Sequence, residues 1–462
     1  MNKALAIVYT TCICAIILCA VLLPGARLSF LLPAAVVCGG ILTATYRLAC
    51  RSFYSTAGEA IIVCVFSLIV CGIILNIWYF TTASGGTFSN PILHNSDSHI
   101  DWYYAMEELD GQPHTIFMPN FRYYIYIVMG LCAVFGRDIG VPLMFNALCF
   151  GLTIIAVGAI TFRLTANRTT SVIAMAATSV MCYLLMEATV LLKDVPLTLC
   201  MAVFILGLTQ IFIDKKLSFK PIICLMLGIA GVTFLRLNML LMLFTGAIIF
   251  MGRNRNVNAT LATVAAVIIV VFVAAKSFMH VPQVAENVLM SDSNPVLNQT
   301  RFVRPWDNLL GTPYHEMSVF KRLLWLPASV VVQFLIPFPW NYMRDTIFGP
   351  TEAIAHFGYF WYLAGAVFLF WIFRLKKVSN RAMVRLAWWG VFLTVATAFM
   401  TSGRVSRYCL PLLPTLLPAV AFTINRKSSR KPLLIWLGVF SVLLCVTLIT
   451  CYQLQMYPWK FR

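Results

Sequence analysis

Two acidic residues in one short polar segment give the clearest chemical signal in the sequence. Asp97 and Asp101 lie within Ser96–Gly111, with His99 between them and Tyr103 two residues further on. A carboxylate beside a substrate can accept the proton of a hydroxyl or amine nucleophile as that nucleophile attacks. The segment is therefore a candidate for general-base catalysis. Asp97, His99 and Asp101 together could also hold a divalent cation.

The same segment has a simpler structural interpretation. Its pattern predicts a short helix that begins near Ser98 and ends at Gly111. Ser98 followed three residues later by Asp101 fits a capping box, in which Asp101 only closes the first turn. Asp97 would then lie just before the helix. There it could be an alternative N-cap, a solvated loop acid or a reactive group that points into a cavity.

Three arginines could hold a phosphate group. Arg236 separates two short apolar runs, while Arg404 and Arg407 lie within four residues before Tyr408. A guanidinium binds phosphate through two parallel hydrogen bonds and stabilises the charge of a departing phosphate. An arginine within hydrocarbon is costly, which favours a function for Arg236, although it could also be an ordinary loop charge. Arg404 and Arg407 could instead extend toward lipid headgroups.

A second acid follows a basic residue at a predicted turn between two spans. Lys193 and Asp194 precede Pro196, so Asp194 could cap a helix that has proline in its first turn. It could equally lie beside a substrate as a second active-site carboxylate. Both interpretations remain open at this point.

The composition determines which elements must position these residues. Of 462 residues, 61% are hydrophobic and 11% are charged, and the mean hydropathy is +0.86. Soluble proteins carry about 25% charged residues. This excludes a soluble multidomain enzyme, a disordered chain and a fibrous protein. The sequence predicts an all-α polytopic membrane protein that forms a single domain over residues 1–462.

Apolar runs of roughly 17 to 25 residues predict about 13 membrane spans. The first run resembles a signal peptide but lacks a small-x-small cleavage site, so we expect a retained anchor. The cysteines lie almost entirely in such runs, which predicts neither disulfides nor a cysteine metal site. The candidate spans lie near 4–24, 28–46, 57–80, 139–162, 170–190, 195–213, 221–235, 238–251, 259–278, 356–373, 386–402, 409–424 and 432–452.

Charge orients the predicted spans. With a cytoplasmic N-terminus, short inner loops hold clusters of Lys and Arg, as the positive-inside rule requires. All acidic residues except Glu59 and Asp214 then face the other side. The net charge of +18 therefore indicates membrane orientation and not a nucleic-acid partner. We expect an integral membrane protein of a bacterial inner membrane, with its site on the periplasmic face.

Two long loops form that outer face. They cover about 81–138 and about 279–355. The first includes an aromatic juxtamembrane helix near 121–136, because tyrosine favours the membrane interface. The second includes the proline-rich run 323–340, which we expect at the interface or as a re-entrant element.

The first outer loop resembles the GT-C superfamily of membrane glycosyltransferases, in particular the protein O-mannosyltransferase and aminoarabinose-transferase branch. In that branch an Asp heads the pattern Asp-Glu-x-x-Tyr-x-x-x-Ala, and Asp97 stands eight residues before Ala105. Two positions depart from the pattern, because Ser98 replaces the Glu and Asp101 stands where Tyr is usual. Asp97 is the first candidate for the base and Asp101 is the alternative.

Further elements follow in the order typical of that branch. They comprise an aromatic juxtamembrane segment, a span with an asparagine, an Asp-x-Pro turn and a late Arg-Tyr-x-x-Pro-x-x-Pro element; a Pro-Phe-Pro-Trp stretch is similar to one seen in some bacterial members. In this chain they correspond to Phe121–Tyr124, Asn146, Asp194–Pro196, Arg407–Pro414 and Pro337–Trp340.

The resemblance implies transfer of a sugar from a polyprenyl-phosphate donor to an acceptor on glycan, lipid or protein, with inversion at the anomeric carbon. Asp97 or Asp101 would act as base, and Arg236, Arg404 and Arg407 would bind the donor phosphate. Lys193, Asp194, His99, Tyr103 and Tyr408 would support the site. The sequence identifies no certain cofactor, and a divalent metal stays an option. Two alternatives are a transporter or flippase of lipid-linked glycan and an O-antigen-type polymerase or ligase.

Overall fold

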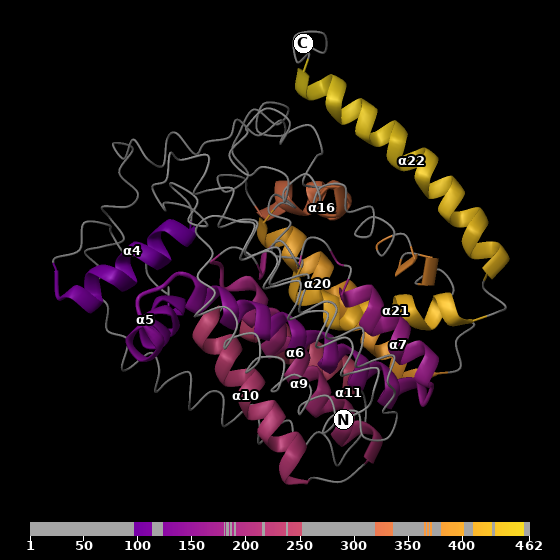
Figure 1. Cartoon of the computed structure of the whole chain (residues 1–462). Coiled ribbons are helices and arrows are strands. Elements are labelled where there is room, and N and C mark those ends of the chain that lie inside the picture. Colours follow the sequence, from indigo (N-terminus) through magenta and orange to yellow (C-terminus); the bar gives the residue numbers. More distant parts are fainter. Residues whose placement is uncertain are drawn as a thin grey trace, which may run out of the picture.

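The computed structural model is a helical bundle (Figure 1). Every regular element among the residues that it describes is a helix, which confirms the all-α prediction for this part of the chain. The structure describes residues 97–112, 123–179, 181, 184, 187–188, 191–214, 218–236, 239–251, 319–335, 365, 367–368, 370–371, 380–401, 410–426 and 430–456.

The described helices agree with most of the predicted apolar runs that they overlap. The spans expected at 4–24, 28–46, 57–80 and 259–278 lie outside the described residues, and 356–373 is described only in part. The helices are α4 (Asp97–Asp110), α5 (Tyr124–Phe135), α6 (Gly140–Thr165), α7 (Arg168–Ser179), α9 (Asp194–Asp214), α10 (Phe219–Leu235), α11 (Met239–Met251), α16 (Val319–Leu335), α20 (Arg381–Thr401), α21 (Leu413–Asn425) and α22 (Arg430–Met456).

Three of these helices are long and apolar enough to cross a membrane. The qualifying stretches are Gly140–Thr165 in α6, Asp194–Ile213 in α9 and Arg381–Phe399 in α20. A helix rises 1.5 Å per residue, so about 20 residues match the hydrocarbon thickness of a bilayer. The described part of the chain is therefore compatible with a membrane protein.

One end of the bundle is rich in basic residues. Asn380 Nδ2 donates to the carbonyl of Leu164 over 2.7 Å, and Asn425 Nδ2 donates to Thr170 Oγ1 over 2.8 Å. These bonds bring the start of α20 to the end of α6, and the end of α21 to the start of α7. We call this the basic end; its residues are Arg163, Arg168, Lys220, Arg381, Arg385 and Arg426.

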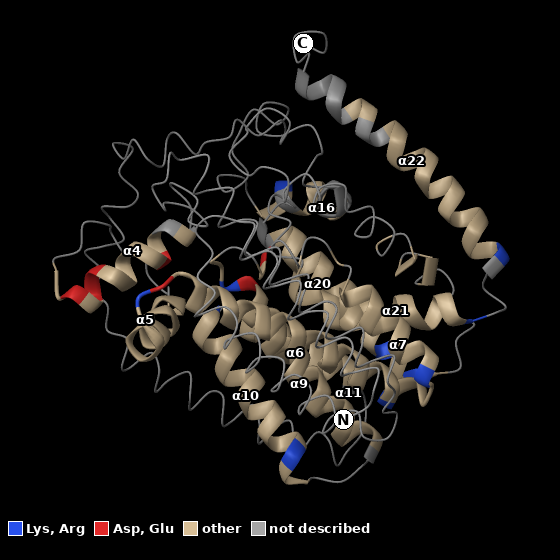
Figure 2. Cartoon of the chain, in the orientation of Figure 1, with Lys and Arg blue, Asp and Glu red and all other residues tan. Residues whose placement is uncertain are grey.

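The ends of α9 and α11 also lie at the basic end. The guanidinium of Arg385 in α20 stacks 5.3 Å from the ring centroid of Phe212 and lies near the carbonyl of Phe250. Helices α6, α9, α11 and α21 therefore end at the basic end, and α7 and α20 begin there. Figure 2 shows the Lys and Arg of α7 and α10 far from the Asp and Glu of α4.

Glycines set the distance between α9 and α10. A Cβ atom at Gly228 would lie 2.6 Å from the Cβ of Phe204 and 2.9 Å from the carbonyl oxygen of Cys200. Only a residue without a side chain allows so close an approach, which is how small residues promote helix packing in membranes. As a result, the end of α10 lies directly against the start of α9.

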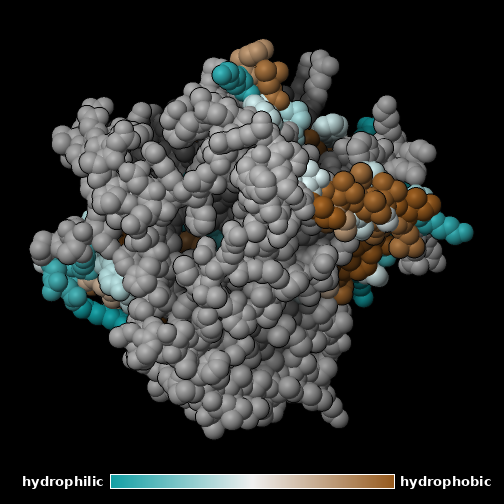
Figure 3. Space-filling view, turned by 90° about the horizontal axis from the view of Figure 1, so that it is seen from above, coloured by the Kyte–Doolittle hydropathy of each residue, from teal (hydrophilic) through white to brown (hydrophobic). Residues whose placement is uncertain are grey.

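Several helices present apolar side chains to the surroundings. On α10, Met226 and Leu227 are exposed, and on α22 the residues Leu434, Ile435 and Leu443 are exposed. Figure 3 shows hydrophobic residues on the side where α22 lies in Figure 1, and hydrophilic residues on the side of α4. Surfaces of this kind are suited to contact with lipid, because water would not solvate them.

Candidate functional site

Five helices bring polar side chains together at the end of the bundle opposite the basic end. Asp101 comes from α4, Tyr124 from α5, Asn146 from α6, Asp194 from α9, and Arg236 directly follows α10. We call these five residues the polar end. All of them except Arg236 are buried, so the fold removes two carboxylates and two hydrogen-bonding side chains from the surface.

An ion pair joins α9 to α10 within the polar end. Arg236 Nη2 lies 3.4 Å from Asp194 Oδ1, and the two side chains are 15% and 1% exposed. The carboxylate of Asp194 forms no hydrogen bond to the side chains and backbone that the structure describes. Burying a charge costs free energy that a single ion pair often fails to return. The pair is therefore better explained by a function than by stability.

A chain of hydrogen bonds crosses the polar end. Tyr124 Oη donates to Asn146 Oδ1 over 2.9 Å, and Asn146 Nδ2 donates to the carbonyl of Leu192 over 3.0 Å. Both side chains are fully enclosed. Burial raises the pKa of Tyr124 well above its ordinary value, and the negative charge of Asp101 raises it further. The phenol therefore stays neutral and remains the hydrogen-bond donor to Asn146.

Asp101 lies inside helix α4 and is 2% exposed. The helix begins at Asp97, so Ser98 is within its first turn and does not precede the helix. This corrects both the predicted capping box with Ser98 as N-cap and the predicted place of Asp97 before the helix. Asp97 and Asp101 are one turn apart and so share one face of the helix. The predicted end is confirmed, because Gly111 adopts a φ of +62° that favours glycine.

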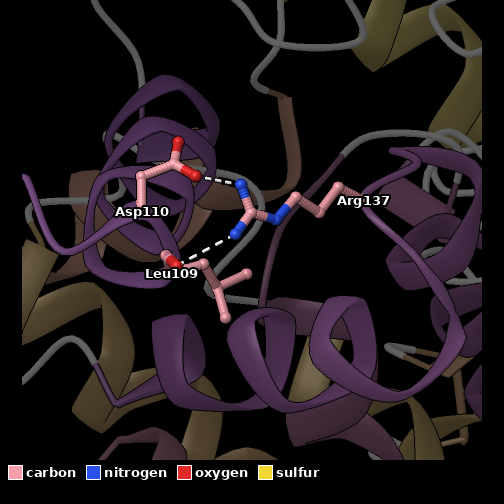
Figure 4. A network of polar contacts seen from close by, with 3 residues as sticks. All are labelled: Leu109, Asp110 and Arg137. Atoms are coloured by element: carbon pink, nitrogen blue, oxygen red, sulfur yellow. Dashed lines mark hydrogen bonds and ion pairs between the residues drawn. The ribbon is translucent and has the colours of Figure 1, made fainter.

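A surface contact fixes the far end of α4. The guanidinium of Arg137, in the connection between α5 and α6, pairs with the carboxylate of Asp110 and donates to the carbonyl of Leu109 over 2.9 Å (Figure 4). Sequence reasoning missed Arg137. Its one available signal was a basic residue in a loop that otherwise carries acids.

The structure does not describe every predicted site residue. The side chains of Asp97 and His99, and the whole of Arg404, Arg407 and Tyr408, lie outside the described residues. The described neighbours of the last three belong to α20 and α21, at the ends of these helices that lie away from the basic end.

The remaining supporting residues are placed close to the site. Lys193 is half-buried and directly precedes Asp194 in the turn that starts α9, while Tyr103 is half-buried on α4. The turn itself was predicted from Pro196, and Asp194 is indeed the first residue of the helix. Its buried carboxylate accepts no hydrogen bond from the described residues, so the predicted role as a helix cap is wrong, and the role as a second active-site carboxylate stays a prediction.

A metal site is not formed by the described side chains. Among them, no three Asp, Glu, His or Cys residues lie close enough to share an ion. The predicted set of Asp97, His99 and Asp101 includes two side chains outside that part, so a divalent cation there stays a prediction.

No family model, curated protein or solved structure matches this chain. We therefore infer the function from the polar end itself.

Proposed function

We propose that the chain is a membrane glycosyltransferase that uses a polyprenyl-phosphate sugar as donor. The observation that carries the proposal is the ion pair between the buried Asp194 and the partly buried Arg236, at the same end of the bundle as the buried Asp101. Sugar transfer needs a carboxylate to accept a proton and a cation to stabilise a leaving phosphate. The polar end offers both kinds of group within a helical scaffold.

The proposed reaction is a single displacement. Asp97, with Asp101 as the alternative, accepts the proton of the acceptor hydroxyl or amine while that nucleophile forms a bond to the anomeric carbon. The bond from this carbon to the phosphate oxygen breaks, and polyprenyl phosphate leaves with the electron pair. Attack from the face opposite the phosphate inverts the anomeric carbon. The acceptor belongs to a glycan, a lipid or a protein.

Arg236 is the described residue best suited to the donor phosphate. A guanidinium has five N–H donors, so it can bind a carboxylate and a phosphate at the same time. In this proposal Asp194 orients Arg236, and Arg404 and Arg407 add positive charge from the connection between α20 and α21. The partly buried position of Arg236 strengthens its own electrostatic interactions.

The proposal includes the orientation predicted from charge. The basic end faces the cytoplasm of a bacterial cell, and the polar end faces the periplasm, where lipid-linked sugars and acceptors meet. The opposite placement of Arg168 and Asp194 along the bundle supports this arrangement. About 13 spans, counted from apolar length, complete the proposed membrane domain.

The direct test uses the full chain in lipid nanodiscs with decaprenyl-phosphate glucose, mannose and arabinose as probes. We expect release of decaprenyl phosphate from at least one donor, measured by mass spectrometry, when a membrane extract supplies acceptors. Asp101→Asn and Arg236→Gln proteins are assayed beside the wild type. Comparison of surface glycans from cells with and without the gene then names the acceptor. Movement of an intact donor across proteoliposomes without its consumption would instead indicate a transporter.

A further inference from the structure

Three consecutive carbonyl groups at the start of α9 accept hydrogen bonds. The carbonyl of Leu192 accepts from Asn146 Nδ2 over 3.0 Å, and that of Lys193 accepts from the N–H of Leu197 over 3.0 Å. The carbonyl of Asp194 accepts from Thr198 Oγ1 over 2.7 Å. The last two donors belong to α9 itself. Asn146 is therefore the donor that ties this turn to another helix.

Tyr124 fixes the orientation of the Asn146 side-chain amide. Its Oδ1 accepts the proton of Tyr124 Oη, so its Nδ2 must face the carbonyl of Leu192. Fully satisfied networks of buried polar groups are rigid and specify one arrangement. The start of α5 thus fixes the backbone only two residues before Asp194.

We propose that Tyr124 and Asn146 are positioning residues that hold Asp194 where it orients Arg236 toward the donor phosphate. The effect on phosphate binding rests on the proposed function. The effect on the turn that precedes Asp194 does not. It adds a role for two side chains outside the ion pair itself. We call the hydrogen bonds from Tyr124 to Asn146 and from Asn146 to the Leu192 carbonyl the relay. Burial and the charges of Asp101 and Asp194 keep the pKa of Tyr124 high. The phenol of Tyr124 therefore stays a hydrogen-bond donor throughout the neutral range.

The first experiment measures the turn without any ligand. Hydrogen exchange of the full chain in nanodiscs is compared between wild type and Asn146→Leu, a change close to Asn in size. We expect faster exchange of amides in residues 191–197, because the Leu192 carbonyl loses its partner. Thr161→Val is the matched control, since Thr161 is buried in the same helix and bonds only within it. Unchanged exchange in Asn146→Leu would overturn the relay.

The second experiment asks whether the relay acts through Arg236. Binding of decaprenyl phosphate is measured for wild type, Asn146→Leu, Arg236→Gln and the double variant. We expect Asn146→Leu to weaken binding about tenfold in the wild-type background, the effect of one buried hydrogen bond. In the Arg236→Gln background we expect Asn146→Leu to weaken binding by less than about twofold, because the effects of residues that act as a unit are not additive. Equal losses in both backgrounds would contradict the proposed role.

Tyr124→Phe sharpens the result. It removes the hydroxyl that donates to Asn146 but keeps the ring. We therefore expect decaprenyl phosphate binding to weaken about threefold in the wild-type background, and not to weaken further in the Arg236→Gln background. A wild-type protein that binds no decaprenyl phosphate would overturn the proposed function. The exchange experiment would then decide the relay by itself.

Discussion

The two ends of the bundle use polar residues in opposite ways. At the basic end, Arg168, Lys220 and Arg426 are exposed, and asparagines 380 and 425 bond to neighbouring helix ends. At the polar end, Asp101 and Asp194 are buried, and the five polar residues come from different parts of the chain. The basic end therefore leaves cations in contact with the surroundings, whereas the polar end encloses two carboxylates, a phenol and an amide.

The two ends differ in the free-energy cost of keeping a charged group in place. An exposed Lys or Arg keeps its water and contributes little to stability. A buried carboxylate loses its water and must be compensated by a cation or hydrogen bonds. Helix ends at the membrane surface can always be solvated, so enclosure is not required by the fold. Among the described residues, the polar end is therefore a place where the fold accepts a cost in stability, which is typical of functional sites.

The largest expected effect concerns the base. We expect Asp97→Asn to lower donor consumption about 10²- to 10⁴-fold, because an amide cannot accept the proton, and Asp101→Asn to lower it less. Glu108→Gln, exposed on the same helix, should change it less than twofold. The assay is release of decaprenyl phosphate. A larger loss in Asp101→Asn would transfer the role of base to that residue.

Removal of the cation at each end tests the comparison directly. Arg236→Gln leaves Asp194 buried without its charged partner, so we expect the free energy of unfolding to fall by about 3 kcal/mol. Arg168→Gln at the basic end should change it by less than about 0.5 kcal/mol. Denaturation in mixed micelles measures both. Similar losses at the two ends would remove the distinction between them.

The contact between α9 and α10 can be widened without touching a charge. Gly228→Leu places a side chain against Phe204 and Cys200, which we expect to cost about 1–3 kcal/mol of unfolding free energy. Separation of Asp194 from Arg236 should also weaken decaprenyl phosphate binding. Gly438→Leu is the control, because a Cβ at Gly438 on α22 meets no atom within 4 Å. Equal behaviour of the two variants would refute the role of the close approach.

The smallest effect is expected at the surface of α4. Arg137→Gln breaks the pair with Asp110, whose two side chains are 52% and 40% exposed. We expect a loss below about 1 kcal/mol that decreases further at high salt, because solvent screens exposed charges. Thermal unfolding at low and high ionic strength measures it. A salt-independent loss would show that the contact works through packing and not through charge.

Much of the fold follows from local pattern. The apolar runs predicted α6, α9 and α20 to within a few residues, since a helix needs a fixed length of apolar chain to cross a bilayer. Gly111 and Pro196 likewise marked a helix end and a helix start. The N-terminus of α4 was predicted one residue late, because Ser98 carries the preferred capping side chain but lies inside the helix.

The pairing within the site did not follow from sequence. Asp194 and Arg236 were separate candidates, each with an ordinary explanation as a helix cap or a loop charge. Nothing local links them, because their contact depends on the close packing of α9 and α10 at Gly228. Tyr124 and Asn146 were noted as elements of a pattern, but their hydrogen bonds join residues in different helices.

The sequence by itself determined that the chain is helical, apolar and asymmetric in charge, because these properties follow from composition and from the spacing of residues along the chain. Only the tertiary structure decided which polar groups meet. Burial and pairing depend on contacts between residues far apart in the chain, and a carboxylate such as Asp194 reads the same in sequence whether water or Arg236 surrounds it.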